Sequence, residues 1–291
     1  MTTGFGILGE LQVVHDGRAL DLGSRRQRGL LARLLVRAGQ PLTTDRLIEE
    51  LWPDDVPDTA RHTLHVYVSR LRSVLGDDRG LLASDAAGYR LSIEAEQLDA
   101  ARFERLAAEG RAALTAGEAG PADERLRDAL TLWRGPALME FADEPFASGE
   151  ATRLDQLRLT VLEDRITAEL ALGRHGQLAE ELRTLTLKQP YREIFWEQYM
   201  LALYRAGRQA DALHAYGEAR TRLAEDLGIE PGPALKRMEQ RVLAHDPTLS
   251  AGVPAAPPAV AAAPPAVATA GAPAGNLPLQ RTAFVGRERD L

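Results

Sequence analysis

The chain has 291 residues, of which 45% are hydrophobic and 26% charged, and its formal net charge is −7. This length allows two domains with substantial cores. The absence of cysteine excludes disulfides, thiolate metal sites and cysteine nucleophiles. The acidic balance argues against non-specific coating of nucleic acid. It leaves room for a local basic surface, because salt screens charges beyond about 8 Å.

No targeting or membrane segment is predicted. The first residues, MTTGFGILGEL, lack the basic stretch and the long apolar run of a signal peptide. No stretch approaches the roughly 20 apolar residues that a spanning helix needs. The lack of cysteine also fits an intracellular chain. We therefore expect a cytoplasmic protein with no membrane partner.

The first hundred residues alternate short extended runs with helical patterns. Asp16-Gly17 is a hairpin turn signal, Ser24 and Thr44 are expected N-caps, and Gly39 is expected to end a helix. The predicted elements are strands at 5–9, 11–15 and 18–22, helices over 25–38, 45–51 and 57–75, and extended runs at 81–84 and 89–93. This order predicts a winged helix-turn-helix, with the helix over 57–75 in the recognition position and residues 81–93 as the wing.

The helix over 57–75 has two chemically different sides. Leu64, Val68, Leu71 and Leu75 fall within a narrow arc at helical spacing. The opposite side carries Thr59, His62, Thr63, Val66, Ser69, Arg70 and Ser73. Hydroxyls, imidazole, guanidinium and one methyl pair suit the major groove, where base edges and the thymine methyl are read. An ordinary amphipathic helix with a basic exterior fits the same pattern.

The helix over 25–38 begins with three cations. Arg25, Arg26 and Arg28 lie in its first turn, where positive charge is unfavourable against the helix dipole. A nearby anion such as a DNA phosphate would relieve this. A solvated basic turn is the alternative.

Four runs in this part carry a resemblance to a known family: RRQRGLLARLLVRAG, LTTDRLIEELWPDDVP, LHVYVSRLRSVLG and GYRL. In this order they resemble the OmpR-type winged helix of the Streptomyces antibiotic regulatory proteins. The resemblance covers residues 1–95. It implies that the third helix enters the major groove and that the wing contacts the minor groove or the DNA backbone.

The resemblance places two sets of DNA contacts on this sequence. The base-reading residues would be His62, Thr63, Val66 and Arg70. The backbone contacts implied by the resemblance are Arg61, Arg72 and Arg90, and the unfavourable positive charge at the start of the first helix adds Arg26 and Arg28 to the expected set. Many wings of this type carry arginine where this chain has residues 85–87, Asp-Ala-Ala, so Arg90 is the better wing candidate.

The loop over residues 52–57 faces RNA polymerase in OmpR-type proteins. The resemblance therefore makes Asp54, Asp55 and Val56 the polymerase-facing residues, with the carboxylates meeting a basic partner surface. A solvated acidic loop is the alternative. Trp52 continues the apolar side of its helix and is expected in the core.

Residues 96–246 are predicted to form successive helices. The expected helices begin at Asp99 and span 122–133, 150–172, 177–189 and 209–227, with an irregular insert at 137–149. The run that starts at Leu170 recurs 34 residues later at Tyr204. This is the tetratricopeptide period, and such hairpins stack to leave a curved inner surface for a partner. One matched pair also fits a plain helical bundle.

Further runs decide between these alternatives by resemblance. LWRGPAL, ALYRAGRQADAL and LGIEPGP resemble the bacterial transcriptional activator domain of the same family. The resemblance spans 96–246 and implies a tetratricopeptide-like helical domain that packs on the DNA-binding domain and supports dimerisation and activation. Arg205 and Arg208 would be partner contacts there, unless they are solvated or paired within the domain.

The composition changes after Asp246. Residues 247–276 are an Ala/Pro-rich flexible linker that cannot form a core. Residues 277–291, LPLQRTAFVGRERDL, resemble the segment that leads into the nucleotide-binding ATPase module of AfsR-like members. No P-loop motif follows. We therefore expect the front part of a larger regulator, cut before that module.

No pattern indicates catalysis, a metal or a cofactor. The six histidines are scattered without zinc-ligand spacing, and neither a nucleophile elbow nor a dinucleotide fingerprint occurs. We predict no enzyme activity, no cofactor and no metal site. The predicted fold class is mainly α with a small β part, an OmpR-type winged helix followed by a tetratricopeptide-like all-α domain.

The predicted function is sequence-specific DNA binding that activates transcription. By resemblance, two copies would bind direct repeats in promoter DNA as a homodimer and recruit RNA polymerase holoenzyme, including its sigma subunit. The regulated genes would be those of antibiotic or secondary metabolism. The alternative is a protein-binding adaptor that acts through the helical repeat domain, and the net acidity favours it slightly.

Overall fold

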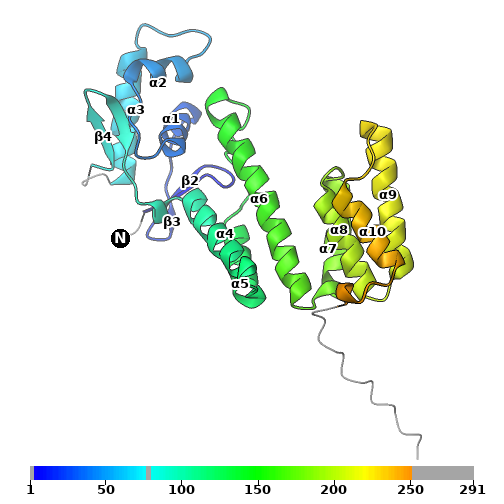
Figure 1. The fold of residues 1–291 in the computed structure, drawn as a ribbon. Helices are drawn as coiled ribbons and strands as arrows, with labels where there is room; N and C mark the ends of the chain where they lie inside the picture. Colours follow the sequence, from blue (N-terminus) through cyan, green and yellow to red (C-terminus); the bar gives the residue numbers. More distant parts are fainter. Residues whose placement is uncertain (1–2, 77–79, 251–291) are drawn as a thin grey trace, which may run out of the picture. The chain divides into compact units, whose positions relative to one another are not determined.

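The computed structural model describes residues 3–76 and 80–250 (Figure 1). The first part contains β1 (Thr3–Gly6), β2 (Gln12–His15), β3 (Arg18–Ala19), α1 (Arg25–Val36), α2 (Thr44–Leu51), α3 (Ala60–Leu75), β4 (Leu82–Asp85) and β5 (Gly88–Leu91). The 3-10 helix η1 (Ala95–Gln97) follows, then α4 (Asp99–Thr115), α5 (Ala119–Thr131), α6 (Pro145–Ala171), α7 (His175–Lys188), α8 (Glu193–Arg205), α9 (Gln209–Leu227), α10 (Pro233–Leu243) and the 3-10 helix η2 (Pro247–Leu249). None of the described helices is long and apolar enough to cross a membrane. Most of the expected linker and the whole segment 277–291 lie outside the described residues.

The β part consists of two small antiparallel sheets. β1, β2 and β3 form one sheet, with Thr3 opposite His15, and β4 pairs with β5 to form the wing. The third strand was expected over 18–22 but ends at Ala19. The reason is a turn in which the Asp21 carboxylate accepts the Gly23 N–H at 2.9 Å and redirects the chain toward α1.

Side-chain caps fix the starts of α1 and α2. The Ser24 hydroxyl accepts the Gln27 N–H, as predicted. The cap of α2 is Thr43 rather than the expected Thr44, which is the first helical residue. The recognition helix α3 begins at Ala60 instead of residue 57, after a turn in which the Pro57 carbonyl accepts the Ala60 N–H.

The predicted apolar side of α3 is confirmed. Leu64, Val68, Leu71 and Leu75 are all buried, with exposed fractions of 0–3%. Trp52 is also buried, as expected for a core residue. The periodicity therefore fixed which side of the helix faces the winged-helix core.

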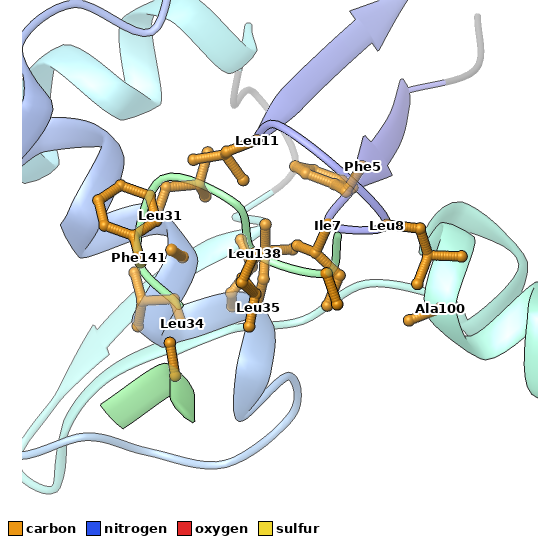
Figure 2. Packing of buried hydrophobic residues seen from close by; sticks show 14 of the residues in the cluster. Phe5, Ile7, Leu8, Leu11, Leu31, Leu34, Leu35, Ala100, Leu138 and Phe141 are labelled. Atoms are coloured by element: carbon orange, nitrogen blue, oxygen red, sulfur yellow. The ribbon is translucent and has the colours of Figure 1, made fainter. Parts of the chain in front are cut away.

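One apolar core runs through the winged helix and into the helices that follow it. A single cluster of buried residues extends along the chain from Phe5 in β1 to Ala168 in α6. Figure 2 shows its centre, where β1 and the residues after it meet α1, the start of α4 and the loop between α5 and α6. The residues labelled there include Ile7, Leu34, Leu138 and Phe141.

Backbone hydrogen bonds reinforce this shared core. The Asp99 carboxylate accepts the N–H groups of Ile7 and Leu8 at 2.8 and 3.1 Å. In return, the carbonyls of Leu8 and Ile7 accept N–H groups from Arg134 and Leu138 at 2.8 and 2.7 Å. The segment after β1 is therefore hydrogen-bonded to the helical region much as a strand is to its neighbours.

The helical region consists of hairpins joined by the same turn. α7 and α9 start at His175 and Gln209, and this 34-residue offset confirms the predicted repeat. The glycines that follow α4, α6 and α8 all have positive φ (Gly117 79°, Gly173 78°, Gly207 77°). After each glycine, the next N–H is accepted by a carbonyl five residues earlier in the chain. The hairpin of α4 and α5 thus repeats a turn whose sequence match was not recognised.

In the helical region, two helix starts differ from prediction by three residues or more. α6 starts at Pro145 rather than residue 150, because proline at the first helical position needs no N–H partner. α5 starts at Ala119 rather than residue 122. The expected irregular insert at 137–149 therefore ends at Glu144, and its residues Ala137, Leu138 and Phe141 enter the shared core.

Candidate nucleic-acid interface

The solvent side of α3 is open. His62 and Arg70 are exposed, and Thr63 and Val66 are half-buried. Within the described part of the chain, no hydrogen bond or ion pair engages these four side chains. The folded protein thus leaves available two ring nitrogens, a hydroxyl, a methyl pair and a guanidinium on one helix face. These are the group types that read base edges in the major groove.

Contacts on its other sides hold α3 in place. Arg72 donates from Nε and Nη2 to the Leu82 carbonyl, at 2.9 and 2.7 Å, and so joins the helix to the wing. The His65 ring lies edge-on to Tyr89, with 6.3 Å between centroids. Burial raises the pKa of Tyr89. Arg72, predicted as a backbone contact, is therefore engaged within the winged helix.

Arg61 and Arg26 lie on the surface beside this face. Arg61 Nη2 is 2.6 Å from Asp45 Oδ1, but the two side chains are 63% and 77% exposed. Such a surface pair contributes about 0–1 kcal/mol, so a phosphate can replace the carboxylate at little cost. The exposed Arg26 guanidinium lies over the Trp52 ring at 5.8 Å. Both guanidinium groups are therefore exposed to solvent.

The first turn of α1 already has its anions within the chain. Arg28 Nη2 is 2.7 Å from Glu140 Oε2, and Arg25 Nη2 is 3.2 Å from Glu144 Oε1. The hypothesis that a DNA phosphate relieves this turn is thus replaced by an internal explanation. Arg28 is half-buried at the contact between α1 and the loop before α6, so it serves that contact.

The wing has a rigid base. Gly88, at φ +125°, brings the wing against the backbone of Leu42, where an added Cβ would lie 2.0 Å from the carbonyl oxygen. The adjacent Tyr89 forms a β-bridge with Leu42. Arg90 is half-buried, and its Nη2 lies 3.8 Å from Asp85 Oδ2. The acidic tip therefore partly neutralises the predicted wing contact.

The loop before α3 is exposed on its acidic side. Asp54 and Asp55 are exposed, and Val56 is an exposed large apolar residue at 50%. Pro53 and Asp54 also border a hollow of about 640 Å³ that is shared with Phe146 at the start of α6. The loop predicted to face polymerase is thus accessible and adjoins the helical region.

Two family models match the chain. One, described as "Transcriptional regulatory protein, C terminal", matches residues 17–91, and the other, "Bacterial transcriptional activator domain", matches 98–243. The regulatory protein DnrI of Streptomyces peucetius is 35% identical over 262 residues, which cover 87% of this chain and 96% of DnrI. The chain belongs to the Streptomyces antibiotic regulatory protein family.

Other relatives are longer than this chain. It is 42% identical to the regulatory protein AfsR of Streptomyces coelicolor and 40% identical to the transcriptional regulatory protein EmbR of Mycobacterium tuberculosis. The matches cover 84% of this chain in both cases, but 25% of AfsR and 64% of EmbR. The structure of M. tuberculosis EmbR in complex with a low-affinity phosphopeptide superposes with a TM-score of 0.81 at 38% identity, covering 86% of this chain and 68% of that one. The predicted fold class is confirmed, and the relatives of the chain are named as regulatory proteins.

Neither arginine of the repeat turn is a free cation. Arg205 donates to the carbonyls of Leu170 and Leu249, at 2.8 and 2.7 Å. Arg208 lies 2.7 Å from Asp211 on the surface. Both arginines are thus paired within the domain, which was the expected alternative to a partner contact. In the part that the structure describes, no group of three or more potential metal ligands occurs.

Sequence reasoning missed a buried cation of the winged helix. The Arg33 side chain is 4% exposed and pairs with Glu50 of α2 and Glu144 before α6. Its guanidinium lies 3.9 Å from the centroid of Phe146. One signal was available, because Arg33 lies among the inward-facing leucines of its helix. Its partners lie too far along the chain for any local pattern to indicate them.

Proposed function

We propose that this chain is a sequence-specific DNA-binding activator of transcription. The observation that carries the proposal is the open face of α3, where His62, Thr63, Val66 and Arg70 have no hydrogen-bond or ion-pair partner among the described residues while the opposite side is buried. A helix held by its wing and presenting such groups suits insertion into the major groove. The match to a transcriptional regulatory model over this region supports the same role.

Each base-reading residue has a chemical role in this proposal. Arg70 donates two hydrogen bonds to one guanine, and Val66 contacts a thymine methyl. His62 and Thr63 hydrogen-bond to base edges. Arg26, Arg61 and Arg90 neutralise phosphates, whereas Arg28 and Arg72 are left out because both are engaged within the protein.

We further propose that the bound protein recruits RNA polymerase holoenzyme, including its sigma subunit. Asp54, Asp55 and Val56 are accessible for this contact. Two copies occupy direct repeats in a promoter, and the regulated genes are those of antibiotic or secondary metabolism. Membership of a family of regulatory proteins such as DnrI supports this assignment.

The test separates base reading from phosphate binding. We expect Arg70→Ala to lose about 1–3 kcal/mol of binding free energy and to relax preference at one base pair. Arg61→Ala weakens binding to all sequences alike and reduces the slope of log affinity against log salt by about 0.9. Gel shifts with fragments selected from genomic DNA measure both effects. An unchanged base preference in Arg70→Ala refutes the assignment.

The net charge of −7 favours one second candidate, a protein-binding adaptor that acts through the helical region. This candidate predicts that selected genomic fragments bind weakly or not at all, with no salt dependence. The same gel shifts therefore distinguish the two functions.

A further inference from the structure

A groove lies on one side of the helical stack. It has a volume of about 370 Å³ and is lined by α6, α8 and α10, which alternate with α7 and α9 along the chain. The volume falls within the range of about 300–1,000 Å³ typical of ligand sites. Its apolar walls are formed by Leu170 and Ala171 of α6, Ile194 and Leu201 of α8, and Met238 of α10.

An unpaired carboxylate opens into this groove from α8. Glu197 is half-buried, and no hydrogen bond or ion pair holds it among the residues described. Burial raises the pKa of Glu197, the nearby Glu193 raises it further, and Arg237 opposes both effects. Glu193 is itself satisfied, because its carboxylate accepts the Gly232 N–H at 2.7 Å. Arg237 thus acts on Glu197 from a distance without forming an ion pair with it, and the carboxylate can still accept a cation in direct contact.

The next residue adds a second unpaired acceptor. The Gln198 amide nitrogen donates to the Glu163 carbonyl at 2.9 Å and to the Thr167 hydroxyl at 3.0 Å. A carbonyl only accepts hydrogen bonds, so this contact fixes which end of the amide is nitrogen. Gln198 is 5% exposed, and its Oε1 is buried with no hydrogen-bond partner. An unpaired buried acceptor is uncommon and costs free energy.

The arginine that lines the groove already has hydrogen-bond acceptors within the protein. Arg205 lines the groove, but this side chain donates to the carbonyls of Leu170 and Leu249. Burial lowers the pKa of Arg205, and its guanidinium is already committed to these two backbone carbonyls. The groove therefore offers apolar walls and unpaired acceptors, which disfavours an anionic ligand.

We propose that this groove binds a short peptide segment of a partner protein, in which an aliphatic side chain lies next to a lysine or arginine. The aliphatic side chain packs between Leu201 and Met238. The cation pairs with Glu197, and a peptide N–H supplies a donor to Gln198. This binding is independent of the DNA contacts proposed for α3.

The test uses synthetic heptapeptides, acetylated and amidated at their ends, and the complete chain. The heptapeptides are presented as an array in which the central residue is Leu and the next residue is Lys, Arg, Gln or Glu. The peptide that binds best is then labelled, and fluorescence anisotropy gives its Kd. We expect Lys and Arg peptides to bind best. Glu197→Gln should weaken them about tenfold and remove their advantage over the Gln peptide.

Two further variants complete the test. Leu201→Arg fills the groove and should abolish binding, whereas Leu187→Arg, at a residue 55% exposed on α7 and outside the groove lining, should leave the Kd unchanged. Unchanged circular dichroism melting shows that each variant is folded, and gel shifts on the same variants report DNA binding separately. Preference for Glu peptides, or undiminished binding in folded Leu201→Arg, overturns the proposal. The proposal is also overturned if the unsubstituted chain binds all the peptides with the same Kd.

Discussion

Replacing Arg33 by methionine tests whether one buried cation holds the winged helix against the helical region. The Arg33 guanidinium donates to the Glu50 carbonyl at 2.6 Å, to the Gly29 carbonyl at 3.0 Å and to the Glu144 carboxylate at 3.1 Å. These contacts join α1, α2 and the start of α6. Methionine keeps most of the side-chain length and removes every donor, so the change isolates the polar contacts.

The expected loss of stability follows from the exposure of the partners. Removing one member of a fully buried ion pair costs about 3–5 kcal/mol, because the remaining charge has no compensation. Glu50 and Glu144 are 23% and 32% exposed, so water partly compensates them. We therefore expect Arg33→Met to lower the free energy of unfolding by about 2–3 kcal/mol. Tm should fall by roughly 4–12 °C.

Urea unfolding followed by circular dichroism measures this loss, and Arg46→Met is the matched control. Arg46 contacts the same carboxylate, with its Nε 2.8 Å from Glu50 Oε1, but its side chain is 47% exposed. An exposed helix pair of this kind contributes about 0.3–0.5 kcal/mol. If the two variants lose equal stability, burial does not determine the strength of this contact and the reasoning is wrong.

Two other predictions concern the wing and the last turn. Gly88→Ala should cost about 3 kcal/mol or more in urea unfolding, because its Cβ meets the Leu42 carbonyl. Gly80→Ala, also at positive φ but with open space around it, should cost about 1–2 kcal/mol, and equal losses would contradict the clash. Hydrogen bonding from Thr248, and next from Arg241, lowers the pKa of Asp246 to about 2. The ionised Asp246 carboxylate should therefore contribute its full stabilisation at pH values above its ordinary pKa of 3.8. This contribution should be lost as the pH falls through about 2. Carboxyl NMR titration should show Thr248→Val moving that pKa toward 3.8, and an unmoved pKa would rule out this cause.

Local periodicity predicted the elements that depend on near neighbours in the sequence. The leucine spacing of α3 identified its buried side, and the recurrence of Leu170 at Tyr204 predicted the repeat. These predictions succeeded because helix faces and turns depend on residues three to five positions apart. Boundaries were less accurate, since a proline such as Pro145 both permits and limits a helix start.

The contacts between the winged helix and the helical region were not predictable in this way. Arg28 pairs with Glu140 across 112 residues, and the Ile7 N–H reaches the Asp99 carboxylate across 92. No period or motif connects such positions. The sequence showed an unexplained cluster of cations at the start of α1, and only the folded chain supplied its anions. The pattern was correctly observed, but the two explanations offered for it, a DNA phosphate and a solvated basic turn, did not include carboxylates from a distant part of the same chain.

This difference also explains which arginines suit DNA binding. Those on the α1 side of the winged helix, such as Arg28 and Arg33, are paired with carboxylates and lose their partners only if the shared core opens. Arg61 has a carboxylate partner too, but it is exposed and replaceable, and Arg70 has none among the described residues. Charge that maintains the fold is thus separated from the charge on and beside the solvent side of α3. Because Arg61 has an exposed, replaceable partner and Arg70 has none among the described residues, we expect this face to remain able to bind an anionic partner although the net charge is −7.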